Sequence, residues 1–271
     1  MSKSSSIYPL DQEYPIWDEH VASYNQNGFI KLGNVLDAVT IDRYDRLITE
    51  QVHVHNTQDI PLDQRDTYGR AFLQVMNLWT KHADVRRFVL NRRLAGIASR
   101  LMGVEGVRLY HDQALYKEAG GGFTPWHADQ YYWPLASEKC ITAWIPLQDT
   151  PLEMGALEFS RGSHRLDVAR NLPISDESES LIEERLSDAH LERIAEPFRI
   201  GDVSFHAGWT FHRAAPNTTS TARRVMCIIY MDRDMLLKAP SNPNQKMDWD
   251  TWCPGAHVGE IINTPLNPVL F

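Results

Sequence analysis

Thr124-Pro125-Trp126-His127-Ala128-Asp129-Gln130 is the most informative segment of the sequence, because it places a histidine and an aspartate two residues apart. In an extended chain, side chains at positions i and i+2 point to the same side. His127 and Asp129 can therefore offer an imidazole nitrogen and a carboxylate oxygen to one metal ion. A third ligand must come from elsewhere in the chain.

His212 is the candidate for that third ligand. It follows the strand-like run Gly201-Asp202-Val203-Ser204-Phe205. Two histidines and one carboxylate on one face of an octahedral ion leave three positions open, which is the arrangement of Fe(II) oxygenases that bind a cosubstrate together with O2. His206 is a rival ligand six residues earlier, and His212 is favoured because only it has Asn217 and Arg223 at the spacing expected of this pattern.

Arg223 comes after a loop that would return the chain beside the strand of His212. A guanidinium at that place can clamp a carboxylate through two hydrogen bonds. A His-x-Asp pair alone occurs by chance in many chains, and the later histidine and arginine make the pattern specific. His53 and His55 share the two-residue spacing, but they end a predicted helix, where such side chains diverge.

The regions around these residues indicate a β core. Many short strands separated by Gly, Pro and Asn predict a sandwich or barrel rather than a parallel sheet. The β-prone runs lie at 105–117, 141–147, 155–159, 202–206 and 223–231. One helical insert is expected to interrupt them, from about Asp176 to Ile194.

The part before residue 103 predicts helices instead. A short helix at 17–27 leads into a short strand at 29–32. Apolar residues then recur at helical spacing over 40–54 and again over 83–102. Residues 56–68 are polar and rich in turn-forming residues.

Composition limits the possible partners. The chain has 271 residues, 43% of them hydrophobic and 23% charged, with a net charge of −8. This balance is ordinary for a globular protein and disfavours nucleic acid or an anionic membrane as a partner, because polyanions require a basic field. No apolar run approaches the roughly 18 residues of a membrane span.

Cysteine usage and the N-terminus indicate a cytoplasmic protein. The odd number of widely separated cysteines gives neither a disulfide framework nor a zinc spacing, which suits a reducing compartment. The N-terminal residues are polar and show no secretion signal. The cysteines are Cys140, Cys227 and Cys253.

Several motifs occur in a fixed order along the chain: Gln26-Asn27-Gly28-Phe29-Ile30, Asp112-Gln113-Ala114-Leu115-Tyr116-Lys117, Thr124 to Asp129, Ala143-Trp144-Ile145-Pro146-Leu147, Gly155-Ala156-Leu157-Glu158-Phe159, Gly162-Ser163-His164-Arg165, and Gly201-Asp202 through His212, Asn217 and Arg223. Together they resemble the phytanoyl-CoA dioxygenase family of Fe(II)/2-oxoglutarate-dependent oxygenases, and the resemblance covers most of the chain. It implies a mainly β fold with helices (α+β), in which N-terminal helices flank a double-stranded β-helix (jelly-roll, cupin-like) core.

The resemblance also implies one domain over residues 1–271. Its expected parts are a loose leader at 1–15, a mostly helical layer at 16–103, a jelly-roll core at 104–235, and a tail at 236–271 that wraps the surface.

The resemblance assigns roles to six residues. His127, Asp129 and His212 are the expected Fe(II) ligands and catalytic residues, and Arg223 is expected to hold the distal carboxylate of 2-oxoglutarate. The remaining two, Trp144 and Lys117, match positions that line the cosubstrate pocket. Ala214 departs from the family pattern, because a small hydroxyl residue often follows the distal histidine there.

The implied reaction consumes 2-oxoglutarate and O2, releases succinate and CO2, and hydroxylates an unactivated C–H bond of a small organic molecule. A carboxylate at Asp129 indicates oxygenation rather than halogenation, since related halogenases carry a small residue at that position. Desaturation, epoxidation and ring closure use the same ligands and remain open. Tyr131-Tyr132-Trp133-Pro134 predicts either an aromatic wall for a partly apolar substrate or barrel core.

Two other classes of protein remain as alternatives. One is a metal-dependent jelly-roll enzyme that does not use 2-oxoglutarate. Arg223 makes this alternative less favoured, because it can bind a cosubstrate carboxylate. The other is a non-catalytic small-molecule binding protein, against which the intact ligand set speaks. The sequence does not identify the substrate or the oligomeric state.

Overall fold

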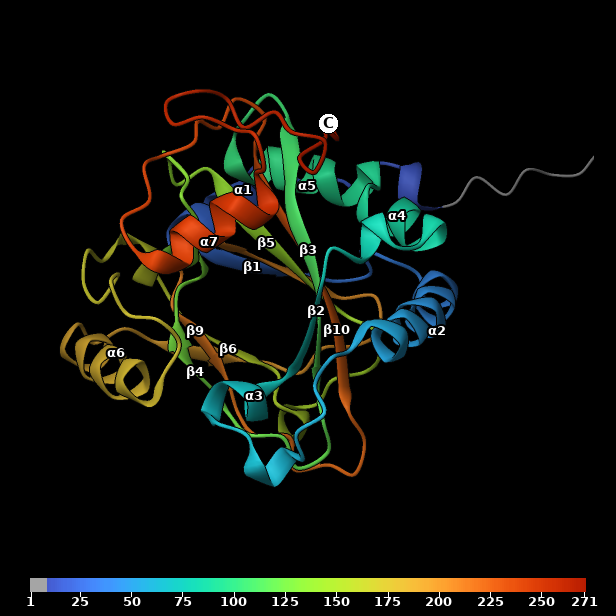
Figure 1. Cartoon of the computed structure of the whole chain (residues 1–271), viewed down its shortest axis with the longest axis vertical. Coiled ribbons are helices and arrows are strands. Elements are labelled where there is room, and N and C mark those ends of the chain that lie inside the picture. The colour runs from blue at the N-terminus through green and yellow to red at the C-terminus, as the bar shows by residue number, and fades with distance from the viewer. Residues whose placement is uncertain (1–8) are drawn as a thin grey trace, which may run out of the picture.

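The computed structural model describes residues 9–271 and contains two antiparallel sheets that face each other (Figure 1). The large sheet has the strand order β1-β8-β5-β10-β3-β2 and the small sheet has the order β4-β9-β6-β7. The strands are β1 Phe29–Leu32, β2 Leu73–Met76, β3 Val107–Lys117, β4 Thr124–His127, β5 Cys140–Pro146, β6 Leu157–Ser160, β7 Arg193–Ala195, β8 Val203–Ala207, β9 His212–Ala214 and β10 Arg223–Asp232. The predicted α+β jelly roll is confirmed.

Alternation along the strands of the large sheet separates an inner face from an outer face. In β10, Val225 and Cys227 belong to the apolar cluster between the two sheets, whereas Met226 and Ile228 belong to the cluster under the helices. This is the two-residue period of a strand with both faces covered. Arg223 therefore begins β10 on the inner face, between the sheets.

Helices cover the outer faces of both sheets (Figure 1). The N-terminal helices lie against the large sheet, and α6 lies against β4 of the small sheet. The helices are α1 Asp18–Asn27, α2 Ala38–His55, α3 Thr67–Ala71, α4 Ala83–Val89, α5 Arg92–Met102, α6 Asp176–Asp188 and α7 Pro243–Trp252, with short 3-10 turns at Pro9–Asp11, Leu62–Gln64, Leu78–Thr80, Asp129–Tyr132, Leu152–Met154 and Ser163–Arg165. None of the described helices is long and apolar enough to cross a membrane.

The single helix expected over 83–102 is wrong, because α4 and α5 are separate. Asn91 separates them: its Oδ1 accepts a hydrogen bond from the Leu94 backbone N–H at 2.8 Å, and its Nδ2 donates to the Phe88 carbonyl at 2.5 Å. An asparagine that caps the following helix in this way needs non-helical backbone at its own position. The apolar periodicity continues across the break and hides it.

Two further expectations need correction. The helical insert ends at Asp188 rather than near Ile194, and the chain then forms the edge strand β7. The tail does more than wrap the surface, because it contains α7, which the Asn242 side chain caps and Pro243 begins. Of the predicted leader, residues 1–8 lie outside the described part of the chain, while Leu10 is buried in the main apolar cluster.

Candidate active site

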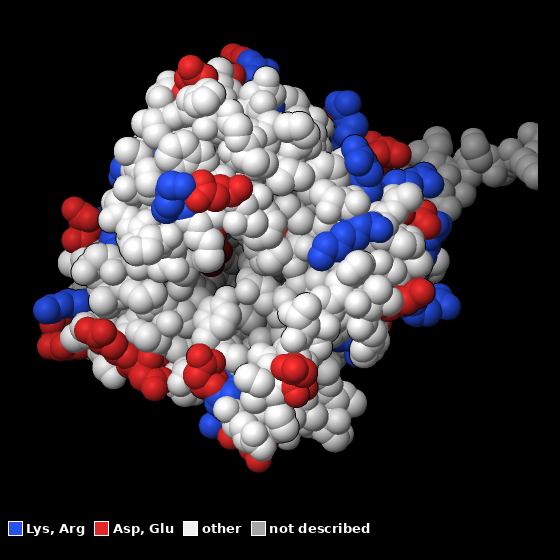
Figure 2. Space-filling view, in the orientation of Figure 1, with Lys and Arg blue, Asp and Glu red and all other residues white. Residues whose placement is uncertain are grey.

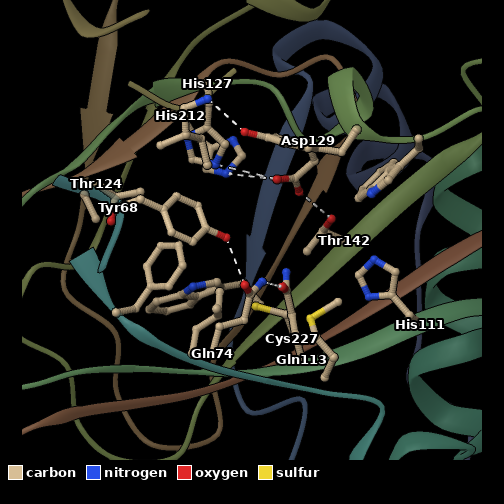
Figure 3. A pocket seen from close by; sticks show the side chains of 18 of the residues that line it. Tyr68, Gln74, His111, Gln113, Thr124, His127, Asp129, Thr142, His212 and Cys227 are labelled. Atoms are coloured by element: carbon tan, nitrogen blue, oxygen red, sulfur yellow. Dashed lines mark hydrogen bonds and ion pairs between the residues drawn. The ribbon is translucent and has the colours of Figure 1, made fainter. Parts of the chain in front are cut away.

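The structure brings His127, Asp129 and His212 together. His127 ends β4 and His212 begins β9, and the two residues are paired across these strands. Ala128 has extended backbone between them (φ −124°, ψ 130°), as expected from the sequence, and Asp129 then begins a 3-10 turn, so both side chains converge on one point (Figure 3). One ligand atom from each residue lies within 4.8 Å of the others.

Hydrogen bonds orient both imidazoles. Nδ1 of His127 lies 2.7 Å from the Pro125 carbonyl, and Nδ1 of His212 lies 3.0 Å from the Thr210 carbonyl. A carbonyl can only accept, so each Nδ1 carries the proton and each Nε2 presents a lone pair. Burial lowers the pKa of both imidazoles, which favours the neutral form that binds a metal. The Nε2 atoms lie 3.6 Å and 3.7 Å from Asp129 Oδ1.

The second oxygen of Asp129 is held by the large sheet. Thr142 on β5 donates to Oδ2 at 2.8 Å, and Nε2 of His206 on β8 lies 3.2 Å from the same oxygen. Thr142 and His206 are directly opposite each other in the β5–β8 register. Burial opposes ionisation of Asp129, but the neighbouring His212 and the hydrogen bond from His206 bring the pKa of its carboxyl well below the ordinary value.

His206 is therefore not in the group of three candidate ligands but supports one of them. The sequence had made it a rival of His212. The two imidazoles lie in one cluster, with ring centroids 4.5 Å apart.

Arg223 is a buried cation in the same cavity as these ligands. Its side chain is 2% exposed, donates from Nη1 to the Gly155 carbonyl, and leaves Nε without a partner. Among the described residues no carboxylate forms an ion pair with it. Burial lowers its pKa to about 10, so the guanidinium stays charged at neutral pH. A buried charge of this kind is costly unless a counter-ion binds it.

The two other predicted pocket residues lie differently. Trp144 lines the cavity, and its ring centroid lies 5.4 Å from the Arg223 guanidinium carbon. Lys117 is opposite Arg223 in the β10–β3 register but does not line the cavity. Its Nζ donates to the Gly122 carbonyl and to Thr124 Oγ1 at 3.2 Å. The position of Lys117 therefore suits support of Thr124, which does line the cavity, rather than contact with a ligand.

The cavity has a volume of about 590 Å³ and opens on the face shown in Figure 2. Much of its wall comes from two segments to which sequence analysis gave no functional role, the stretch from Tyr68 to Met76 and helix α7. Tyr68, Gln74 and Gln113 form a chain of hydrogen bonds along it, with distances of 2.9 Å and 2.6 Å (Figure 3). Of the predicted aromatic wall, Tyr132 and Trp133 line the cavity, whereas the buried Tyr131 does not.

Part of this cavity wall could have been predicted from the two-residue alternation along β3. Once β3 is recognised as a strand, every second residue along it is expected to point to the same face. His111, Gln113 and Leu115 lie on the inner face in this way, and all three line the cavity. No comparable signal indicates that α7 folds back over the site, because its position depends on tertiary packing.

A family model described as phytanoyl-CoA dioxygenase (PhyH) matches residues 24–225 of the chain. The chain belongs to the phytanoyl-CoA dioxygenase family. The resemblance to this family that the sequence motifs indicated is thereby confirmed. This family member is 27% identical over 152 residues to a protein of Stutzerimonas stutzeri described as a probable alpha-ketoglutarate-dependent hypophosphite dioxygenase. The match covers 54% of the chain and 52% of that protein, so the chain spans about half the length of this curated relative.

Solved structures resemble the family member over nearly its whole length. The alpha-ketoglutarate-dependent carbocyclase SnoK from nogalamycin biosynthesis is 26% identical with a TM-score of 0.77, covering 94% of this chain and 97% of that one. The epimerase SnoN, solved with Fe3+, alpha ketoglutarate and nogalamycin RO, is 25% identical with a TM-score of 0.77, covering 94% and 98%. EctD from S. alaskensis, at 19% identity and a TM-score of 0.69 over 98% and 92%, shares the fold.

Proposed function

We propose that this chain is an Fe(II)- and 2-oxoglutarate-dependent dioxygenase that hydroxylates an unactivated C–H bond of a small organic molecule and releases succinate and CO2. The proposal rests mainly on the buried position of Arg223. Its guanidinium has no carboxylate partner among the described residues and lies in the cavity that is also lined by His127, Asp129 and His212. A dicarboxylate bound to a metal at these three residues could place its other carboxylate on Arg223. It would then give the guanidinium a counter-ion and the metal further ligands.

The three side chains fit Fe(II) as ligands. Both imidazoles present Nε2 with the proton fixed on Nδ1, and Asp129 presents Oδ1 while Oδ2 is bound elsewhere. Two nitrogens and one oxygen suit an iron centre with open positions better than a closed zinc site, which takes four ligands, often with sulfur. The free Cys227 lines the cavity but does not belong to this group.

Each residue of the candidate site would have a separate role. His127, Asp129 and His212 would hold the metal, and Thr142 with His206 would keep the carboxylate from rotating. Bound Fe(II) would supply the redox chemistry that couples O2 reduction and decarboxylation of 2-oxoglutarate to oxidation of the substrate. The strands and helices around the cavity would limit the access of water.

Arg223 would orient the cosubstrate. Its guanidinium can donate to a carboxylate through atoms that have no partner in the chain. Trp144, which stacks near the guanidinium, restricts its position. Because Lys117 does not line the cavity and burial lowers its pKa to about 6, Arg223 is the cation on which the cosubstrate would depend.

The test is anaerobic binding of Fe(II) and 2-oxoglutarate, followed by the visible metal-to-ligand charge-transfer band that the chelated cosubstrate produces. We expect the wild-type protein to show the band, His212→Ala to lose it, and Arg223→Leu to require far more 2-oxoglutarate. Arg224→Ala is the matched control, because Arg224 points to the other face and pairs with Asp45 at 2.7 Å.

The outcomes separate the three classes of protein. Iron binding without the band would make the chain a jelly-roll enzyme that does not use 2-oxoglutarate. A protein that binds no iron would be a small-molecule binding protein. Hydroxylation itself is tested with isotopically labelled O2, since a hydroxylated product gains one labelled oxygen atom, whereas the ring closure or epimerisation named for the solved relatives adds none.

A further inference from the structure

The cavity has two ends that differ in charge. Arg223 marks one end, and His111 lies six residues away along β10 and β3, opposite Ile229. Six strand residues span roughly 20 Å. Of the described residues that line the cavity, Arg223 is the one permanent cation, and bound 2-oxoglutarate would neutralise it. The space beyond the candidate metal ligands therefore contains no permanently charged basic side chain among the described residues.

An acidic group lies in that space instead. Asp248 on α7 is 7% exposed, lines the cavity, and accepts a hydrogen bond from the Tyr110 hydroxyl at 3.0 Å. Burial raises its pKa to about 7, so it carries negative charge above neutral pH. In Figure 2 the hollow on this face is rimmed by uncharged side chains.

His111 lines the same cavity and does not neutralise this carboxylate. The imidazole is 3% exposed, and burial lowers its pKa to about 3, so it remains uncharged. Its Nδ1 has no hydrogen-bond partner, although it is buried and the side chain points into the cavity (Figure 3). A buried polar atom without a partner is unusual in a folded protein.

The remaining surface at this end is flat and apolar. The Trp252 ring lies 5.6 Å from the His111 ring between centroids, and Trp133 lies 6.3 Å from it on another side. Phe72, Met76 and Met247 add apolar area to the wall. Aromatic walls with few polar groups favour molecules that contain rings.

We propose that this end of the cavity, formed by Asp248, His111 and Trp252, binds a ring-bearing organic molecule that is uncharged or positively charged, and excludes anions. An anion placed beside a buried carboxylate with no cation nearby would be repelled and would lose its hydration. The inference rests on the proposed function only in treating this space as the substrate end of an oxygenase. It sets the chain apart from the relative named for hypophosphite, which is an anion.

The experiment measures the affinity of four probes by titration calorimetry, with Fe(II) and saturating 2-oxoglutarate under anaerobic conditions. The probes are 2-naphthol, 2-naphthylmethylamine, 2-naphthoate and hypophosphite. At a pH about one unit above the Asp248 pKa of about 7, we expect 2-naphthoate to bind at least about tenfold more weakly than 2-naphthol, and hypophosphite not to bind.

Two variants localise the effect. Asp248→Asn removes the charge at constant size and is expected to raise the affinity for 2-naphthoate toward that for 2-naphthol, while Asp248→Glu keeps the discrimination. Asn244→Lys places a cation on the same helix and is expected to raise 2-naphthoate affinity as well, which keeps the test valid if Asp248→Asn fails to fold. Circular dichroism checks the fold of each variant.

The proposal is overturned if 2-naphthoate or hypophosphite binds the wild-type protein as well as 2-naphthol does, if none of the ring-bearing probes binds, or if a folded charge variant leaves the ratio unchanged. The charge-transfer band of the wild-type protein reports on the proposed function separately. Loss of that band with the charge discrimination intact would refute the cosubstrate assignment and leave the binding inference standing.

Discussion

Asp129 has its two carboxylate oxygens in different environments. Oδ1 faces the two imidazoles, and Oδ2 is held by Thr142 and His206, which belong to the opposite sheet. Residues that hold a ligand in this way typically change metal affinity by 10–100-fold when they are removed. The orientation of the Asp129 carboxylate therefore depends on Thr142 and His206, which are not among the candidate metal ligands.

We expect His206→Ala to weaken Fe(II) binding by about 10–100-fold, because Asp129 can then rotate away from the imidazoles. Competition with a coloured Fe(II) chelator measures the affinity. Ser204→Ala is the control, because Ser204 lies two residues earlier on the same face of β8 and its hydroxyl has no partner. Equal affinities in His206→Ala and in the wild type would show that Asp129 needs no such support.

Lys117 leads to a prediction about pH. Burial lowers its pKa from 10.5 to about 6 in the folded protein, so between these values the unfolded chain binds more protons. Stability then rises with pH across that window. We expect Lys117→Met to flatten this rise in the free energy of unfolding, measured by urea titration at several pH values. Lys139→Met, at an exposed lysine, is the control; an unchanged slope in Lys117→Met would contradict the argument.

At the scale of elements, α6 braces both strands that present the histidines. Glu179 accepts from the Trp126 backbone N–H at 2.7 Å and from Arg213 at 2.8 Å. Trp126 precedes His127, and Arg213 follows His212. The helix thus holds the two ligand strands from their outer side, although it contributes no residue to the cavity.

We expect Glu179→Ala to destabilise the fold by about 1–3 kcal/mol, because the backbone N–H of Trp126 loses its acceptor in a largely buried place. Fe(II) affinity should fall with it, because β4 is no longer fixed. Urea unfolding and chelator competition measure the two effects. Glu177→Ala changes an exposed residue of the same helix and should alter neither. Destabilisation with unchanged metal affinity would limit the brace to a structural role.

Asn91 joins α4 to α5 through both ends of its amide. We expect Asn91→Ala to lower the free energy of unfolding by about 1–2 kcal/mol through loss of the helix cap. Asn91→Asp keeps the acceptor for Leu94 and should recover part of the loss. Urea titration of the three proteins checks the order, and an Asp variant no better than Ala would mean that the bond to Phe88 dominates.

The sequence predicted elements well where periodicity was strong and poorly where a single side chain or tertiary packing decided. The long strands and the helix at 40–54 were predicted with small errors at their ends. The boundary at Asn91 was missed because apolar spacing continued through it. The short strands β2, β7 and β9 were missed because three or four residues carry too little pattern to be distinguished from a loop.

For the whole molecule, the candidate metal ligands and Arg223 could be identified from motif order, and the structure brings them into one cavity. The far wall of the cavity could not be identified. Tyr68, Gln74 and Asp248 lie in segments that looked like a turn-rich connection and a tail, and only tertiary packing of distant parts of the chain places them together. Local pattern contains no information on such packing.

We expect Fe(II) and 2-oxoglutarate to stabilise the whole molecule, because they would supply partners for the buried Arg223 guanidinium and for the three candidate metal ligands. A ligand at 100 times its dissociation constant adds about 2.7 kcal/mol. Adding Fe(II) and then 2-oxoglutarate under anaerobic conditions should raise the melting temperature in two steps. In Arg223→Leu only the first step should remain, and a full second step would refute the role of Arg223.

The two wall segments, the stretch from Tyr68 to Met76 and α7, flank the strands of the metal ligands in the sequence, one before and one after. Neither contains a residue of the metal group or Arg223. Changes there during evolution can therefore alter which molecule is accepted without disturbing oxygen chemistry. We therefore expect exchange of these two segments between family members to change which molecule is accepted while leaving the metal group and Arg223 in place.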